Sequence, residues 1–157
     1  MTLKRLILVV LAALISPAAQ PASAGQTVEE AGAIACVTDK WDEKEVEKGH
    51  KLADAVSRCV LIPDDPAMPK VTEECKGRYE FNPDGSWKAS GTCMDTFKNG
   101  DTMTLTWEEG SHLKEYTFKK TGGTGKYQGV KGGGTYLYEN LTDTLAGGRY
   151  KSKIELP

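Results

Sequence analysis

Two histidines and several pairs of adjacent acidic residues, three of which we consider, could carry acid–base chemistry in this sequence. His50 lies in a charged stretch and His112 beside a glutamate, so a nucleophile and its base would have to be brought together across the fold. Neighbouring residues of a strand point to opposite faces, so no acidic pair would present both carboxylates to one substrate. We therefore name no catalytic residue and expect these side chains to be solvated; the pairs are Asp64-Asp65, Glu73-Glu74 and Glu108-Glu109.

The cysteines favour disulfides over a metal site. A zinc site would need closely spaced cysteine pairs or added histidines, whereas the nearest two cysteines, Cys59 and Cys75, are sixteen residues apart. An even number of cysteines in an exported chain indicates paired thiols. We expect two disulfides and no bound metal; the four cysteines are Cys36, Cys59, Cys75 and Cys93.

A glycine-rich segment at residues 121–136 holds seven of the 17 glycines and invites comparison with phosphate-binding loops. The comparison fails, because Tyr127 follows Gly125-Lys126 where a magnesium-binding serine or threonine belongs. The dinucleotide fingerprint fails as well, because its third glycine would fall on Gln128. We expect no cofactor, and we expect these glycines to let a sheet bend and its strands approach closely.

The first 24 residues have the pattern of a secretory signal peptide. Lys4 and Arg5 precede an apolar run at residues 6–15, and Ala22-Ser23-Ala24 forms a cleavage site. The run is about half the roughly 20 residues needed to cross a bilayer, so we expect removal of the signal and no membrane anchor afterwards. The location would be periplasmic or extracellular.

Residues 25–157 are of the right length for a single domain. The chain has 20 basic and 22 acidic residues, mixed along its length, so it lacks the basic surface that nucleic acid or an anionic membrane requires. No feature indicates an oligomeric state.

From Thr72 onward, alternating residues and frequent turn signals predict a β-sandwich or β-barrel. Residues 76–81 and 87–92 flank a turn at Asn82-Pro83-Asp84-Gly85 and form a hairpin. If this hairpin is symmetric about the turn, Cys75 lies opposite Cys93 at a separation close to disulfide geometry. Cys36 then pairs with Cys59 about a second turn at residues 47–49.

Residues 42–56 allow either an amphipathic helix or strand with irregular chain, and Gly49 favours the second. A further hairpin is predicted at Asn99-Gly100, with Met94 and Thr96 facing the same interior as Met103 and Leu105. That parity conflicts with Cys93, which implies either a β-bulge near Cys93-Met94 or another register. Later strands are expected at residues 116–119, 136–141 and 149–156.

The segment from Gly122 to Tyr136, with Gly91-Thr92-Cys93, Asn99-Gly100-Asp101 and Trp107, resembles the allene oxide cyclase barrel-like and dirigent-like proteins, including small exported bacterial members of unknown function. The resemblance covers about residues 75–136 and implies an all-β fold, a small antiparallel barrel of roughly eight strands with glycine-rich bends. It does not fix an activity, since the group includes cyclases and proteins that steer radical coupling.

Aromatic residues supply most of the apolar area available to such a barrel. They fill its core or, in part, line a mouth that holds a flat hydrophobic molecule. Our leading hypothesis is a non-catalytic exported module that binds a small hydrophobic or aromatic ligand or serves as a structural unit. The alternatives are a cyclase or isomerase acting inside the barrel and a protein-interaction module of the cell envelope. The residues expected to line the barrel are Tyr79, Phe81, Trp87, Trp107, Tyr116 and Phe118.

Overall fold

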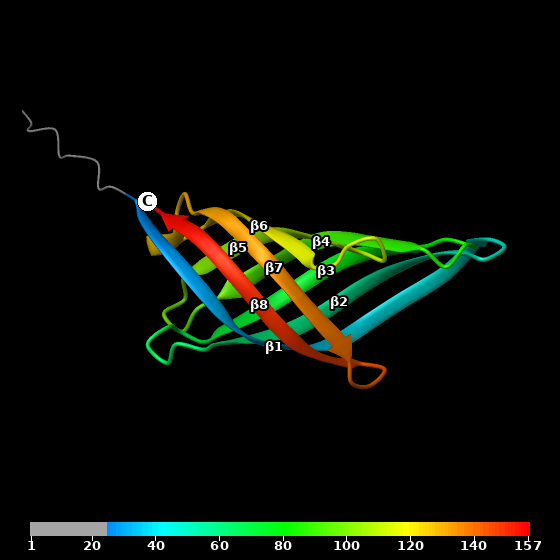
Figure 1. Ribbon diagram of the computed structural model, residues 1–157, viewed down its shortest axis with the longest axis horizontal. Helices are drawn as coiled ribbons and strands as arrows, with labels where there is room; N and C mark the ends of the chain where they lie inside the picture. Colours follow the sequence, from blue (N-terminus) through cyan, green and yellow to red (C-terminus); the bar gives the residue numbers. More distant parts are fainter. Residues whose placement is uncertain (1–24) are drawn as a thin grey trace, which may run out of the picture.

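The computed structural model describes residues 25–157, so the segment in which a signal peptide is expected lies outside the described residues. These residues form one closed barrel of eight antiparallel strands, in which each strand pairs with the next in sequence and β8 pairs with β1 (Figure 1). This confirms the predicted fold class. No helix in residues 25–157 is long and apolar enough to span a bilayer. The elements are β1 (Gln26–Glu47), β2 (His50–Pro63), β3 (Val71–Phe81), β4 (Trp87–Thr96), β5 (Thr102–Gly110), β6 (Tyr116–Gly123), the single-turn helix η1 (Gly125–Tyr127), β7 (Lys131–Asn140) and β8 (Leu145–Leu156).

The two ends of the barrel differ. The base, on the left of Figure 1, is formed by the loops at residues 64–70, 97–101 and 124–130 and contains both the start of β1 and the end of β8. An apolar cluster packs the base, and in it the rings of Phe97 and Tyr127 stack with centroids 4.2 Å apart. The other end, which we call the mouth, is formed by the loops at residues 48–49, 82–86, 111–115 and 141–144. The buried members of the base cluster are Val71, Phe97, Met103, Tyr127, Val130 and Ile154.

The β3–β4 hairpin has the register that the sequence predicted, and the β1–β2 hairpin has the predicted pairing of its two cysteines. Cys75 pairs with Cys93 and Cys36 with Cys59, and both pairs form disulfides. Residues 42–56 are strand on both sides of the turn at residues 48–49. Gly49 in this turn has a φ of 76°, which residues other than glycine rarely adopt. The helical alternative for this segment is therefore excluded. The two disulfides join β1 to β2 and β3 to β4.

The register predicted for the β4–β5 hairpin is wrong. Its loop contains three residues, because the Phe97 carbonyl accepts from Gly100 N–H and Gly100 takes a φ of 88°. Asp95 consequently faces Met103, and no bulge occurs at Cys93 in this ladder. Met94, which was expected inside, is on the outer face and 42% exposed. The extra loop residue thus turns an aspartate, rather than a methionine, into the barrel.

The glycine-rich segment allows close strand contacts around β7. A Cβ atom at Gly133 would collide with the Phe118 carbonyl of β6, and one at Gly134 with the Lys151 carbonyl of β8. Gly125, Gly129 and Gly132 have positive φ where the chain leaves β6, passes through η1 and enters β7. These glycines therefore allow the sheet to bend and its strands to approach closely, as the sequence indicated.

Candidate functional site

The aromatic residues expected to line the barrel lie on its inward face, toward the mouth. Trp107 is 7% exposed, and the other five are half-buried. Tyr79 is central to this group, with its ring 6.0 Å from Trp107 and 6.2 Å from Trp87. Trp87 in turn lies 6.0 Å from Tyr116 on β6. Rings from β3, β4, β5 and β6 thus form one contiguous aromatic cluster toward the mouth.

Trp41 joins this group, which the sequence analysis did not foresee. Its ring lies 5.0 Å from that of Tyr79. The register of β1 against β2 shifts between Thr38 and Lys40, so odd-numbered residues beyond this irregularity take the face that even-numbered residues hold before it. A bulge of this kind has no clear signature in the sequence, and alternation alone would place Trp41 outside.

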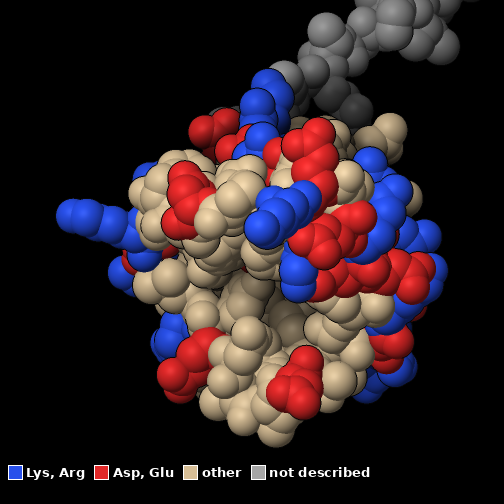
Figure 2. All heavy atoms as spheres, turned by 90° about the vertical axis from the view of Figure 1, so that its right-hand side faces the viewer, with Lys and Arg blue, Asp and Glu red and all other residues tan. Residues whose placement is uncertain are grey.

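Parts of the interior remain accessible to solvent. On the side of the barrel formed by β1 and β2, the inward-facing Ile34, Ala55 and Ser57 are only half-buried. Figure 2, which looks into the mouth, shows a hollow lined by uncharged residues, with Lys, Arg, Asp and Glu gathered around it. An interior filled by side chains would bury these residues completely. The interior on this side of the barrel is thus not completely filled by side chains.

Glu109 is a buried carboxylate at the mouth. It is 5% exposed, and its oxygens accept hydrogen bonds from the hydroxyls of Tyr136 and Tyr138 at 2.8 Å each and of Tyr79 at 3.5 Å. Burial raises the pKa of Glu109, and the three phenols partly offset this by stabilising the ionised form. The expectation that the Glu108-Glu109 pair is solvated is wrong for Glu109, because strand alternation turns one member of the pair inward.

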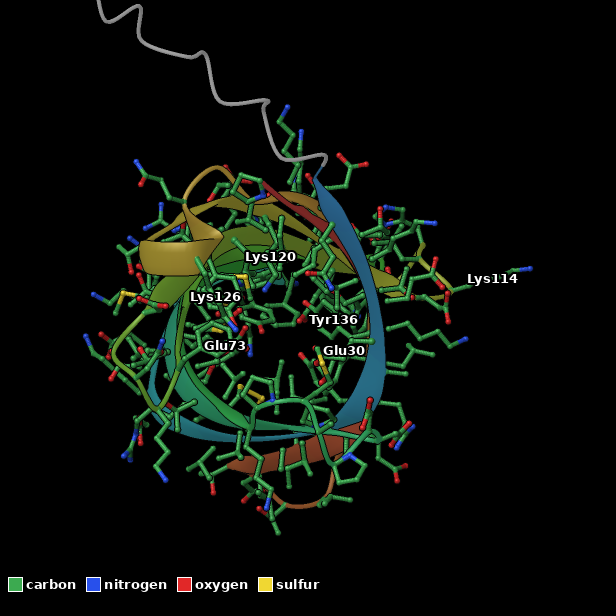
Figure 3. The ribbon with its side chains drawn as sticks, turned by 90° about the vertical axis from the view of Figure 1, so that its left-hand side faces the viewer. Glu30, Glu73, Lys114, Lys120, Lys126 and Tyr136 are labelled. Carbon is green, nitrogen blue, oxygen red and sulfur yellow. A yellow bond between two sulfur atoms is a disulfide. The ribbon has the colours of Figure 1, made fainter. Side chains whose placement is uncertain are left out.

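A second buried acidic group lies between the mouth and the base. Asp95 is 1% exposed and accepts from Lys120 Nζ at 2.5 Å, and Glu73 is its cross-strand neighbour. Burial, and then the negative charge of Asp95, raise the pKa of Glu73 to about 8. Figure 3, which looks in from the base, shows Glu73 and Lys120 within the ring of strands and Lys114 extending outward. The expectation of solvation is therefore wrong for Glu73 also.

Two buried polar atoms in residues 25–157 have no hydrogen-bond partner, Asp95 Oδ1 and Trp107 Nε1. The six-membered ring of Trp107 lies over Gly77 and Gly91, since a Cβ at either position would collide with it. Glycine in mid-strand here makes room for the indole. The indole N–H of Trp107, which precedes Glu109 by two residues on β5, is thus a buried donor without an acceptor. Such donors are uncommon in folded proteins.

Within residues 25–157, the histidines and cysteines form neither a nucleophile–base pair nor a metal site. His50 contacts Glu80 at 3.2 Å, and His112 is exposed in the β5–β6 loop. Ligand atoms of Cys59, Glu73 and Cys75 lie within 4.8 Å of one another. Both sulfurs are in disulfides, however, and a metal site needs thiolates.

Two grooves near the mouth, of about 400 Å³ and 350 Å³, are lined mostly by outward-facing charged residues such as Arg78, Glu80 and Lys88. The larger groove reaches the aromatic group of the mouth at Trp41, and the smaller one reaches Glu109. The mouth, with Glu109 beneath its aromatic residues, is therefore the candidate site.

No protein-family model and no curated protein sequence matches this chain. Among solved structures, it is similar to a pterocarpan synthase dirigent protein, with 12% identity, a TM-score of 0.54 and coverage of 92% of this chain and 99% of that one. It is also similar to a protein of unknown function of the DUF3224 family from Shewanella oneidensis MR-1, with 10% identity, a TM-score of 0.59 and coverage of 84% and 98%. At such identities the likeness shows the fold alone. The chain has a dirigent-like barrel, as the sequence resemblance implied.

Proposed function

We propose that this protein is an exported binding protein that holds a small hydrophobic or aromatic molecule in the mouth of its barrel. The supporting observation is the ring of half-buried aromatic side chains around a hollow, with the buried carboxylate of Glu109 below it. Ligand sites are concave and mainly apolar, with a few polar groups that fix orientation. The mouth has this composition.

Export is part of the proposal. The signal peptide expected at residues 1–24 lies outside the described residues, and support comes from the two disulfides. Disulfides persist in oxidising compartments such as the periplasm and the extracellular space. Non-reducing peptide mapping of protein recovered from the host would test this. Recovery of four free thiols would contradict it.

The binding proposal is tested with N-phenylnaphthylamine, a neutral dye that fluoresces in apolar surroundings. We expect a saturable increase in fluorescence with one dye per chain. Tyr116→Ala removes an inward ring of the mouth and should weaken binding about three- to tenfold, the range expected for one aromatic contact.

Thr117→Ala is the matched control, because Thr117 is exposed on the outer face of the same strand. It should bind the dye as the wild type does. Absence of saturable binding, or equal loss in the two variants, would count against a site in the mouth.

The cyclase or isomerase alternative is favoured by one observation, the buried carboxyl of Glu73 with its raised pKa. Acid–base catalysts need carboxyls of this kind. Mass spectrometry and chromatography of a ligand recovered after prolonged incubation separate the two functions. A binding protein returns the molecule unchanged, whereas an enzyme returns an isomer, in smaller amounts when Glu73 is replaced by glutamine.

A further inference from the structure

The two buried acidic groups of the barrel differ in how their charge is balanced. Lys120 neutralises Asp95 in a direct ion pair. Glu109 takes part in none of the nine ion pairs formed by residues 25–157, and its hydrogen-bond partners are three neutral phenols. A buried carboxylate without a counter-charge is unfavourable. The fold thus supplies a cation for one acid and leaves the other, at the mouth, without one.

The surroundings of Glu109 suit a cation from outside. Burial raises the pKa values of Tyr79, Tyr136 and Tyr138. These phenols therefore stay neutral and donate hydrogen bonds to the carboxylate. A carboxylate has about four acceptor positions, so three donors leave capacity for another. No lysine or arginine forms an ion pair with Glu109 in the described residues, and the side chains that contact its carboxylate are aromatic.

Those rings can stabilise a positive charge through their faces. Tyr116 and Tyr138 have centroids 5.6 Å apart, and Tyr136 and Tyr138 are stacked at 6.1 Å. A cation is attracted when it lies within about 6 Å of a ring centroid, and several rings around one carboxylate form the type of cage that binds ammonium groups.

Resting on the proposed binding function, we propose that the mouth selects a ligand carrying a positively charged amine, whose ammonium group donates to Glu109 between the tyrosine rings. The apolar part of the ligand then packs against the outer aromatic residues of the mouth. Among the buried titratable residues of the described chain, Lys120 balances Asp95 and the raised pKa of Glu73 favours its neutral form, which leaves Glu109 as the acid without a cation. A cationic ligand brings this interior closer to neutrality.

Isothermal titration calorimetry near neutral pH tests the proposal with benzylammonium and benzyl alcohol, which have the same ring and differ in charge. We expect the wild type to bind benzylammonium about tenfold or more tightly than the alcohol, the difference that one charge-assisted hydrogen bond provides. Glu109→Gln should lose this preference. Glu108→Gln, which changes the outward-facing neighbour, should keep it.

Equal affinities for the two compounds in the wild type would overturn the amine proposal and leave the binding function standing. Binding of the neutral dye without any binding of benzylammonium would do the same. Failure of both compounds and of the dye would instead remove the proposed function itself. If Glu109→Gln does not fold, the wild-type comparison decides alone, because it requires no variant.

Discussion

Replacing Lys120 by methionine is expected to lower the free energy of unfolding by about 3–5 kcal/mol, the loss typical of removing one partner of a buried ion pair. Methionine matches the length of the lysine side chain, so the cavity left behind is small. The loss arises because Asp95, 1% exposed, keeps its negative charge without a cation beside it. Urea denaturation near neutral pH measures the difference.

Two further variants distinguish the loss of the ion pair from a nonspecific loss of stability. Lys119→Met alters the exposed neighbour on the outer face of β6 and should change stability by less than about 0.5 kcal/mol. Lys120→Met combined with Asp95→Asn should recover much of the loss, because the uncompensated charge is gone. If Lys120→Met and Lys119→Met were equally stable, the buried ion pair described here would not exist.

Glu73→Gln is expected to stabilise the protein at alkaline pH. The pKa of Glu73 is raised to about 8 in the folded barrel by burial and by Asp95, and its value in the unfolded chain is near 4.5. The folded state therefore retains a proton that the unfolded state releases between these values. The contribution of Glu73 to stability is thus fully present below about pH 4.5 and is lost as the pH rises to about 8. Glutamine mimics the protonated acid and does not titrate.

The gain in the free energy of unfolding should approach about 5 kcal/mol above pH 8, the equivalent of the shift from 4.5 to about 8, and vanish near pH 4. Thermal unfolding of both proteins from acid to alkaline pH measures it as a difference that widens with pH. Glu74→Gln, on the outer face, should show no such widening. A constant difference between Glu73→Gln and the wild type would mean that Glu73 titrates like a solvated acid.

Local symmetry made part of this fold predictable. The turn at residues 82–85 and alternating residues on either side of it defined the β3–β4 register, and one disulfide followed from that register. The register predicted for the β4–β5 hairpin was wrong, because Asn99-Gly100 is compatible with loops of two or three residues. Each loop length turns the opposite set of residues inward. The position of Asp95 depended on that choice.

The polar site was not predictable for a different reason. Glutamates are usually exposed, and burial of Glu109 is tolerated because Tyr136 and Tyr138 of β7 donate to it. Lys120 reaches Asp95 from β6 across the intervening β5 in the same way. Such partners lie two strands apart and become neighbours only when the consecutive strands assemble into a curved sheet, so the residues around each acid give no sign of them.

The central claim, that the mouth above Glu109 is a ligand site, is tested most directly by a crystal structure of the protein with benzylammonium. We predict the ligand's ring among Tyr79, Trp87 and Tyr116, with its nitrogen within hydrogen-bond distance of a Glu109 oxygen. A ligand bound only on the outer face, or a mouth filled by the protein's own side chains, would contradict the claim.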